Sequence, residues 1–130
     1  MRKGENAMRI LVIDGQGGRI GRALVEELRR RGFDGCITAV GTNSIATAAM
    51  LKAGADEGAT GENPVIVQCR TAGVIAGPIG ITLADAMLGE VSPRMAAAVG
   101  QSAAPMTVPY CAFSGTRNLM PKFCSILANT

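Results

Sequence analysis

Hydrophobic positions in the first part of the chain follow two patterns in succession. Residues 10–13 form a short apolar run, which is typical of a buried parallel strand. Beyond it, Ile20, Leu24 and Leu28 recur every four positions while charged residues fill the other face, which predicts an amphipathic helix. Several glycines lie between the two. The chain therefore begins with a strand, a glycine-rich turn and a helix, the first part of a βαβ unit.

The same patterns repeat further along the chain. We expect strands at residues 36–40, 73–77 and 106–110, and helices at 44–54, 81–88, 94–99 and 119–127. Residues 65–69 fit either a strand or a helix. We favour a short helix there because Asn63 and Pro64 are typical of a helix start. The glycine-rich, acidic stretch 54–64 predicts a loop.

This alternation predicts the fold class. Strands separated by helices favour a three-layer, Rossmann-like α/β fold with an open, mostly parallel sheet of about four to five strands and helices on both faces. Pro109 places the last strand at an edge or makes it end there. We expect residues 1–7 to be a flexible leader and residues 8–130 to form one domain.

The composition of the chain argues against several classes of function. The chain has 130 residues, 48% of them hydrophobic, and no apolar run long enough to cross a membrane. Its four aromatic residues and net charge of +3 argue against a nucleic-acid surface built on stacked rings. Four scattered cysteines and the absence of histidine argue against a metal site and favour a reducing, cytoplasmic setting. The high apolar share suggests a homodimer.

The first glycine-rich turn is the main candidate binding site. Glycines let backbone N–H groups approach a phosphate, and the following helix N-terminus adds partial positive charge. Gly15, Gly17 and Gly21 match G-x-G-x-x-x-G in the strand-to-helix context that this motif requires. The candidate residues are Asp14, Gly15, Gln16, Gly17, Gly18, Arg19, Ile20 and Gly21. The alternative is a packing turn without a ligand.

A second candidate turn follows the second predicted strand. An NAD site places an acidic residue here for the ribose hydroxyls, but this chain has Thr42 and Asn43. These side chains suit a 2′-phosphate, so we expect an NADP-like nucleotide. They are equally suited to cap the next helix.

A third turn, Gly77-Pro78-Ile79-Gly80, follows the next predicted strand and is expected to close the site. Glu90 follows it and is the candidate acid for chemistry in this region. A single carboxylate without a visible partner is more often a solvated or capping residue.

Known catalytic motifs do not fit the chain. A P-loop fails because Arg22 and Ala23 stand where Lys and Ser or Thr belong. The first turn resembles that of short-chain dehydrogenases, G-x-x-x-G-I-G, although Arg19 replaces the second glycine. Their Tyr-x-x-x-Lys pair is absent, since Tyr110 is followed four positions later by Ser114. Without histidine, the usual hydrolase schemes are excluded as well.

Six short motifs taken together resemble one known family. They are Asp14-Gly-Gln-Gly-Gly18 with Ile20-Gly21, Gly41-Thr-Asn43 with Ala46-Thr47, residues 50–55, residues 58–63, residues 77–80, and Met87-Leu-Gly-Glu90. The chain is similar, over about residues 8–110, to a small bacterial family catalogued only as a domain of unknown function. The resemblance implies a cytosolic protein with a Rossmann-like fold and no established activity.

Two principal functions follow from the sequence. The first is a protein that binds a phosphorylated nucleotide or dinucleotide at the first turn. The second is a non-enzymatic assembly or regulatory module, with structural glycine turns and an interface near residues 84–99. A third is a small-metabolite transferase with Glu90 as general base.

Overall fold

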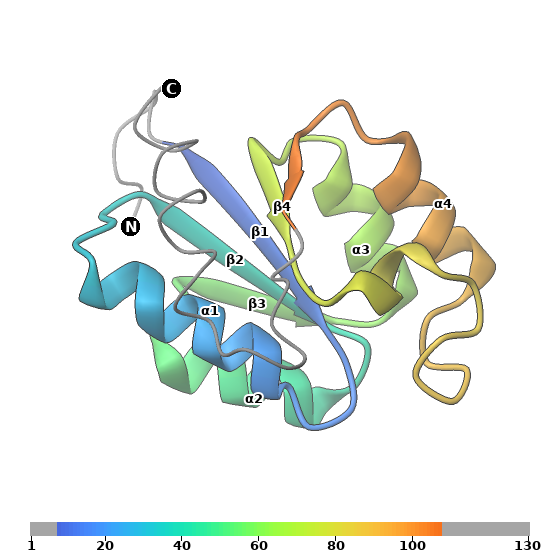
Figure 1. The fold of residues 1–130 in the computed structure, drawn as a ribbon, viewed down its shortest axis with the longest axis horizontal. Coiled ribbons are helices and arrows are strands. Elements are labelled where there is room, and N and C mark those ends of the chain that lie inside the picture. Colours follow the sequence, from blue (N-terminus) through green and yellow to red (C-terminus); the bar gives the residue numbers. More distant parts are fainter. Residues whose placement is uncertain (1–7, 108–130) are drawn as a thin grey trace.

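The computed structural model describes residues 8–107, which form alternating strands and helices (Figure 1). The strands are β1 (Arg9–Asp14), β2 (Cys36–Gly41), β3 (Glu57–Thr60), β4 (Val74–Ala76) and β5 (Met106–Thr107). The helices are α1 (Arg19–Arg30), α2 (Ser44–Ala53), α3 (Glu62–Cys69), α4 (Pro93–Gln101) and the 3-10 helix η1 (Ile79–Thr82).

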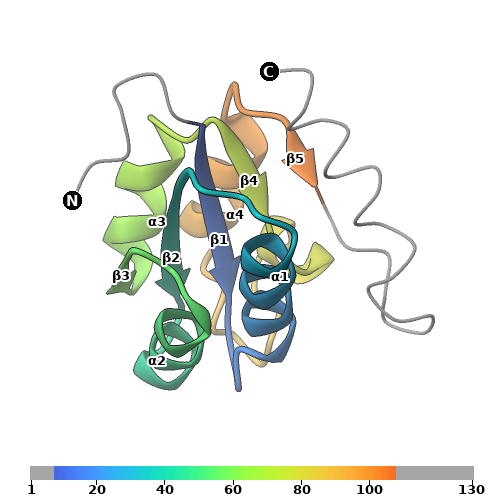
Figure 2. The same ribbon diagram turned by 90° about the vertical axis from the view of Figure 1, so that its left-hand side faces the viewer.

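The strands form one parallel sheet in the order β3-β2-β1-β4-β5, with β3 and β5 at its edges (Figure 2). Helices α1 and α2 cover one face, and α3 and α4 cover the other (Figure 1). The predicted three-layer α/β class with an open parallel sheet is therefore confirmed.

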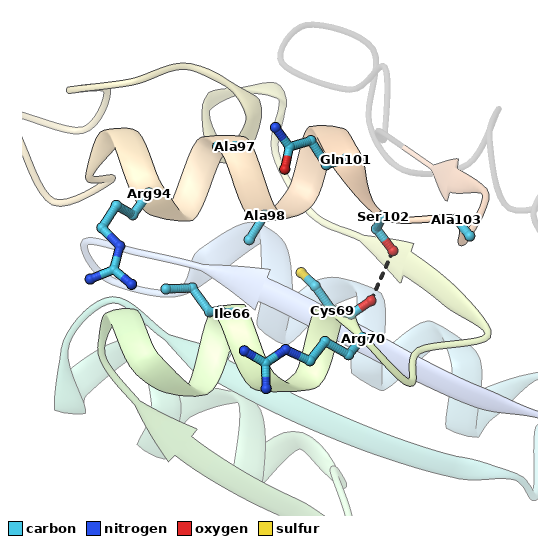
Figure 3. A pocket seen from close by; sticks show the side chains of 9 residues that line it. All are labelled: Ile66, Cys69, Arg70, Arg94, Ala97, Ala98, Gln101, Ser102 and Ala103. Carbon is cyan, nitrogen blue, oxygen red and sulfur yellow. Dashed lines mark hydrogen bonds between the residues drawn. The ribbon is translucent and has the colours of Figure 1, made fainter.

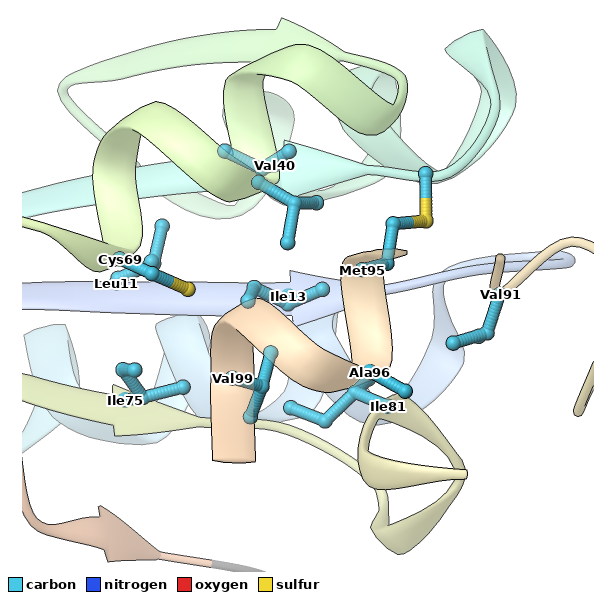
Figure 4. Packing of buried hydrophobic residues seen from close by; sticks show 11 residues of the cluster. Leu11, Ile13, Val40, Cys69, Ile75, Ile81, Val91, Met95, Ala96 and Val99 are labelled. Carbon is cyan, nitrogen blue, oxygen red and sulfur yellow. The ribbon is translucent and has the colours of Figure 1, made fainter. Parts of the chain in front are cut away.

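Strand β1 lies at the centre because it supplies apolar side chains to both layers. Ile10 and Val12 pack with α1 and α2, and the alternate residues Leu11 and Ile13 pack with α3 and α4 (Figure 4). Successive side chains of a strand point to opposite faces, so a continuous apolar run is needed where both faces are covered. All four side chains are buried.

Most predicted elements have the expected type. Residues 65–69 lie in helix α3, which confirms the choice of a helix over a strand. The last predicted strand begins at Met106 and lies at the sheet edge, as Pro109 suggested. Its predicted end at Tyr110 and the helix predicted at 119–127 lie outside the described residues.

The loop predicted for residues 54–64 is wrong in part, because Glu57–Thr60 is strand β3. Only four residues long and largely exposed, this strand has no apolar run that the sequence could reveal. It exists because its backbone pairs with β2 from Thr38 to Gly41. The Thr38 hydroxyl also donates to Glu57 Oε1 at 2.8 Å.

The helix predicted at residues 81–88 is also wrong. Only η1 is helical there, and the following loop has left-handed backbone at Asp85, Met87 and Leu88, with φ of 67°, 57° and 58°. Hydrogen bonds from Asp85 N to Val91 O and from Val91 N to Ala86 O close this loop on itself. We refer to residues 83–91 as the 83–91 loop.

The chain direction across the sheet reverses beside β1. Strands β2 and β3 are added on one side of it, and the chain then returns to place β4 on the other side. The carboxyl ends of β1 and β4 therefore form a topological switch point, where ligands of open α/β proteins usually bind.

Candidate functional site

The turns that follow β1 and β2 lie side by side at the carboxyl edge of the sheet. Parallel pairing puts Asp14 opposite Gly41, the last residues of the two strands. The N–H of Thr42 donates to the carbonyl oxygen of Asp14 at 2.9 Å, which holds the turns together. The candidate residues of the first two turns are thus brought into one site.

Glu90 of the 83–91 loop joins both turns. Its Oε1 accepts hydrogen bonds from Gln16 N at 2.7 Å, from Thr42 Oγ1 at 2.6 Å and from Asn43 Nδ2 at 2.9 Å. The Thr42 hydroxyl is the main cause of the lowered pKa of Glu90, and the Gln16 and Asn43 donors act in the same direction. The side chain therefore carries a negative charge at neutral pH.

Asp14 supports the first turn from beneath. It is 4% exposed, and its two carboxylate oxygens each accept a hydrogen bond at 2.7 Å, from Gly15 N and Gly21 N. Burial raises its pKa, the backbone donors oppose that shift, and the charge of Glu90 adds to it. This carboxylate holds the turn against the start of α1.

Close packing fixes the shape of the turn at Gly15 and Gln16. A Cβ on Gly15 would overlap with Thr42 Oγ1 and would lie 2.6 Å from Met87 Sδ and 2.9 Å from Glu90 Oε1. Gln16 has a left-handed φ of 49°, and its carbonyl oxygen accepts from Asn43 Nδ2 at 2.9 Å. The backbone of Gln16 is thus held from two sides while its side chain is exposed.

The turn is open at Gly17. Among the described residues, a Cβ on Gly17 would find only Arg19 Cγ within contact distance, at 3.8 Å. Gly18 is the N-cap of α1, with a left-handed φ of 71° and no side-chain cap. Within residues 8–107 the N–H groups of Gly17 and Arg19 have no hydrogen-bond acceptor. Two unpaired donors beside a helix N-terminus are what an anionic group needs.

Two arginine side chains near the turn, Arg22 and Arg19, differ in whether they form an ion pair with a described residue. Arg22 donates to Glu26 one helical turn further on, at 2.9 Å, so it is engaged along α1. Arg19 is the first residue of α1, is exposed, and forms no ion pair with another described residue. Ile20, also a candidate, is half-buried and packs against the core below α1.

The third turn is linked to the others only by packing. Gly77 leaves no room for a Cβ because the Ile13 carbonyl oxygen lies against it, and Pro78 is buried. Met87 lies close to both Gly15 and Gly80, whereas Ile79 is exposed. Among the described residues, no hydrogen bond joins residues 77–80 to Glu90 or to the first two turns.

The sequence pointed to Glu90 as a candidate residue but did not place it at the end of β2. The two polar residues after β2 and the lone acid after Gly89 were visible signals, yet nothing in the sequence pairs them. Met87 is half-buried and packs between the first and third turns.

Two cavities lie away from this edge. One of about 500 Å³ lies between α3 and α4, where Ile66, Ala97 and Ala98 line it together with Arg70 and Arg94 (Figure 3). Another, of about 330 Å³, lies between α1 and α2. Neither is lined by residues of the three turns.

Among residues 8–107, no group of three or more acidic or cysteine side chains could hold a metal ion. Burial raises the pKa of the Cys69 thiol to about 11, so this cysteine stays protonated. No helix between residues 8 and 107 combines the length and hydropathy of a membrane span.

The chain belongs to the protein family described as "Domain of unknown function (DUF3842)", whose model matches residues 9–110. This match confirms the resemblance found in the six motifs. No curated protein and no solved structure matches the chain.

Proposed function

We propose that the protein binds a phosphorylated nucleotide or dinucleotide across the carboxyl ends of β1 and β2. The observation that carries this proposal is a pair of N–H groups, on Gly17 and Arg19, that have no acceptor within residues 8–107 and lie at the switch-point end of β1. Parallel α/β sheets bind nucleotide phosphates at this position, where the N-terminus of the first helix faces the ligand.

The phosphate group lies, in this proposal, outside Gly17. The approach is open because Gly17 has no side chain and little around it, and Arg19 can add a positive charge. Asp14 does not compete for the phosphate donors, since its carboxylate is buried against Gly15 and Gly21. The turn thus has an inner face occupied by the carboxylates of Asp14 and Glu90, and an outer face at Gly17 that is open as far as residues 8–107 are concerned.

A catalytic role for Glu90 as general base is less well supported than a binding role. Its three donors lower the pKa of the carboxylate, and a base with a lowered pKa removes protons poorly at neutral pH. A role in assembly through residues 84–99 is also less favoured, because Met95, Ala96 and Val99 are buried in the protein's own core.

Isothermal titration calorimetry with NAD and NADP tests the proposal. We expect wild-type protein to bind at least one of the two, and Gly17→Val to weaken that binding by roughly tenfold or more because the side chain occupies the phosphate position. Arg19→Ala should weaken it to a smaller extent.

Gly100→Val is the matched control, since Gly100 lies in α4 and a Cβ there meets open space. It should bind as wild type does. Wild-type protein that binds neither dinucleotide would contradict a dinucleotide site, and Gly17→Val protein that binds with unchanged affinity would contradict a phosphate position at this turn.

A further inference from the structure

The carboxylate of Glu90 lies at the end of β2, although Glu90 belongs to a loop between β4 and α4. Its Oε1 is within hydrogen-bond distance of Thr42 and Asn43, the two residues that directly follow β2. In dinucleotide-binding α/β folds an acidic residue at this end of the second strand accepts hydrogen bonds from the ribose hydroxyls. The turn after β2 has no acidic residue of its own, and Glu90 of the 83–91 loop places a carboxylate there.

We propose that Glu90 recognises the ribose of the bound nucleotide and selects a free 2′-hydroxyl over a 2′-phosphate. This inference rests on the proposed nucleotide site, and it replaces the NADP-like ligand expected from the sequence with an NAD-like one. The NADP-like ligand was expected because no acidic residue directly follows β2. In the structure, Glu90 places a carboxylate at that position.

The two carboxylate oxygens of Glu90 differ in their hydrogen-bond partners. Oε1 accepts three hydrogen bonds, which orient the carboxylate, whereas Oε2 has no donor among residues 8–107. An ionised carboxylate oxygen with free lone pairs is a strong acceptor for a hydroxyl group. A ribose hydroxyl can therefore bind at Oε2 without displacing the loop.

The charges around Glu90 disfavour a 2′-phosphate. The nearest described partners of its carboxylate are a backbone amide, a hydroxyl and a side-chain amide, none of them cationic. The charge of Glu90 also acts on Asp14, a second carboxyl group beneath the same turn. A phosphate placed beside Glu90 would meet like charge, and none of the described hydrogen-bond partners of Glu90 is a cation that could offset it.

The test compares the NAD and NADP affinities of wild type and Glu90→Gln by calorimetry. Glutamine keeps an Oε1 acceptor for Gln16, Thr42 and Asn43, so the loop should stay in place, and an unchanged circular dichroism spectrum checks this. We expect wild type to prefer NAD by roughly tenfold or more, and Glu90→Gln to lose most of that preference. Glu26→Gln, on the exposed face of α1, should behave as wild type.

Each other result overturns the inference in a recognisable way. If Glu90→Gln tightens NAD and NADP equally, Glu90 is a competitor for an anion site and not a ribose ligand. If both dinucleotides bind but the ratio of their affinities does not change in the variant, the nucleotide site stands and the role of Glu90 is wrong. If neither binds to wild type, the dinucleotide form of the proposed function fails and this inference fails with it.

Discussion

Glu90 Oε1 accepts a hydrogen bond from the backbone N–H of Gln16 at 2.7 Å, across a separation of 74 positions in the chain. This contact ties the 83–91 loop, which follows η1, to the glycine-rich turn that follows β1. The turn and the loop are consequently one structural unit.

Gly15→Ala should destabilise the protein. Its methyl group would overlap with Thr42 Oγ1 and crowd Met87 and Glu90, and overpacking of this kind costs about 1–3 kcal/mol. Urea unfolding measures the change in the free energy of unfolding. Gly17→Ala is the matched control, because its methyl group has free space and Gly17 does not have a left-handed φ. Equal losses of stability in both variants would show that Gly15 is not a close-packed position.

The contribution of Glu90 to stability should depend on pH. Its pKa in the folded protein lies below the ordinary value of 4.5, so its contribution is present above pH 4.5 and is lost as the pH falls through the folded-state pKa. The contribution of Asp14 to stability has the opposite pH dependence. Because the pKa of Asp14 is raised in the folded protein, its contribution falls as the pH rises.

The difference in unfolding free energy between wild type and Glu90→Gln reports on Glu90 and on its charge interaction with Asp14, because the rest of the Asp14 contribution is common to both proteins. We expect that difference to be largest at neutral pH and to shrink gradually as the pH falls below 4.5. A difference that is independent of pH would mean that the three donors do not favour the ionised form.

Leu88→Gly should stabilise the protein by about 0.5 kcal/mol. Leu88 is 97% exposed and has a φ of 58°, a conformation that glycine adopts without the steric cost of a side chain. Leu83→Gly is the comparison, since Leu83 is 54% exposed but has an ordinary extended backbone with φ of −115°. That variant should lose about 0.5–1 kcal/mol. Thermal unfolding distinguishes the two, and a loss in both would contradict strain at Leu88.

Arg29→Ala should cost about 2–3 kcal/mol, because Arg29 connects α1 to the residues that precede β2 and follow α2. Its guanidinium donates to the carbonyl oxygens of Phe33, Gly35 and Gly54 and to Asp56 Oδ2, the last at 2.6 Å, and its side chain is 22% exposed.

Arg30→Ala serves as its control. Arg30 pairs with Glu27 on the same helix and is 67% exposed, so its removal should have only a small effect. Chemical denaturation of both variants gives the comparison. A similar, small change in the two would mean that the carbonyl contacts of Arg29 do not stabilise the connection between α1, β2 and α2.

The candidate site was predictable where it depends on neighbouring residues. Asp14 to Gly21 had the composition of a strand-to-helix turn, and Asn43 was recognisable as a cap, which its bond from Ala46 N confirms. The 83–91 loop was not predictable, since its residues have acceptable helix propensity. In the structure Met87 packs against Gly15 and Glu90 accepts a hydrogen bond from Gln16 N, contacts between distant residues that local propensity does not encode.

The sequence by itself determined the α/β class, the central strand and the position of the glycine-rich turn. These features arise from local causes: the spacing of apolar residues, the backbone freedom of glycine and the capping of helix ends. Only the tertiary structure decided that residues 57–60 form a strand, since an exposed edge strand exists through pairing with β2. It also decided where Glu90 lies. Hydrogen bonds between distant residues depend on the chain path through space, which the order of residues does not display.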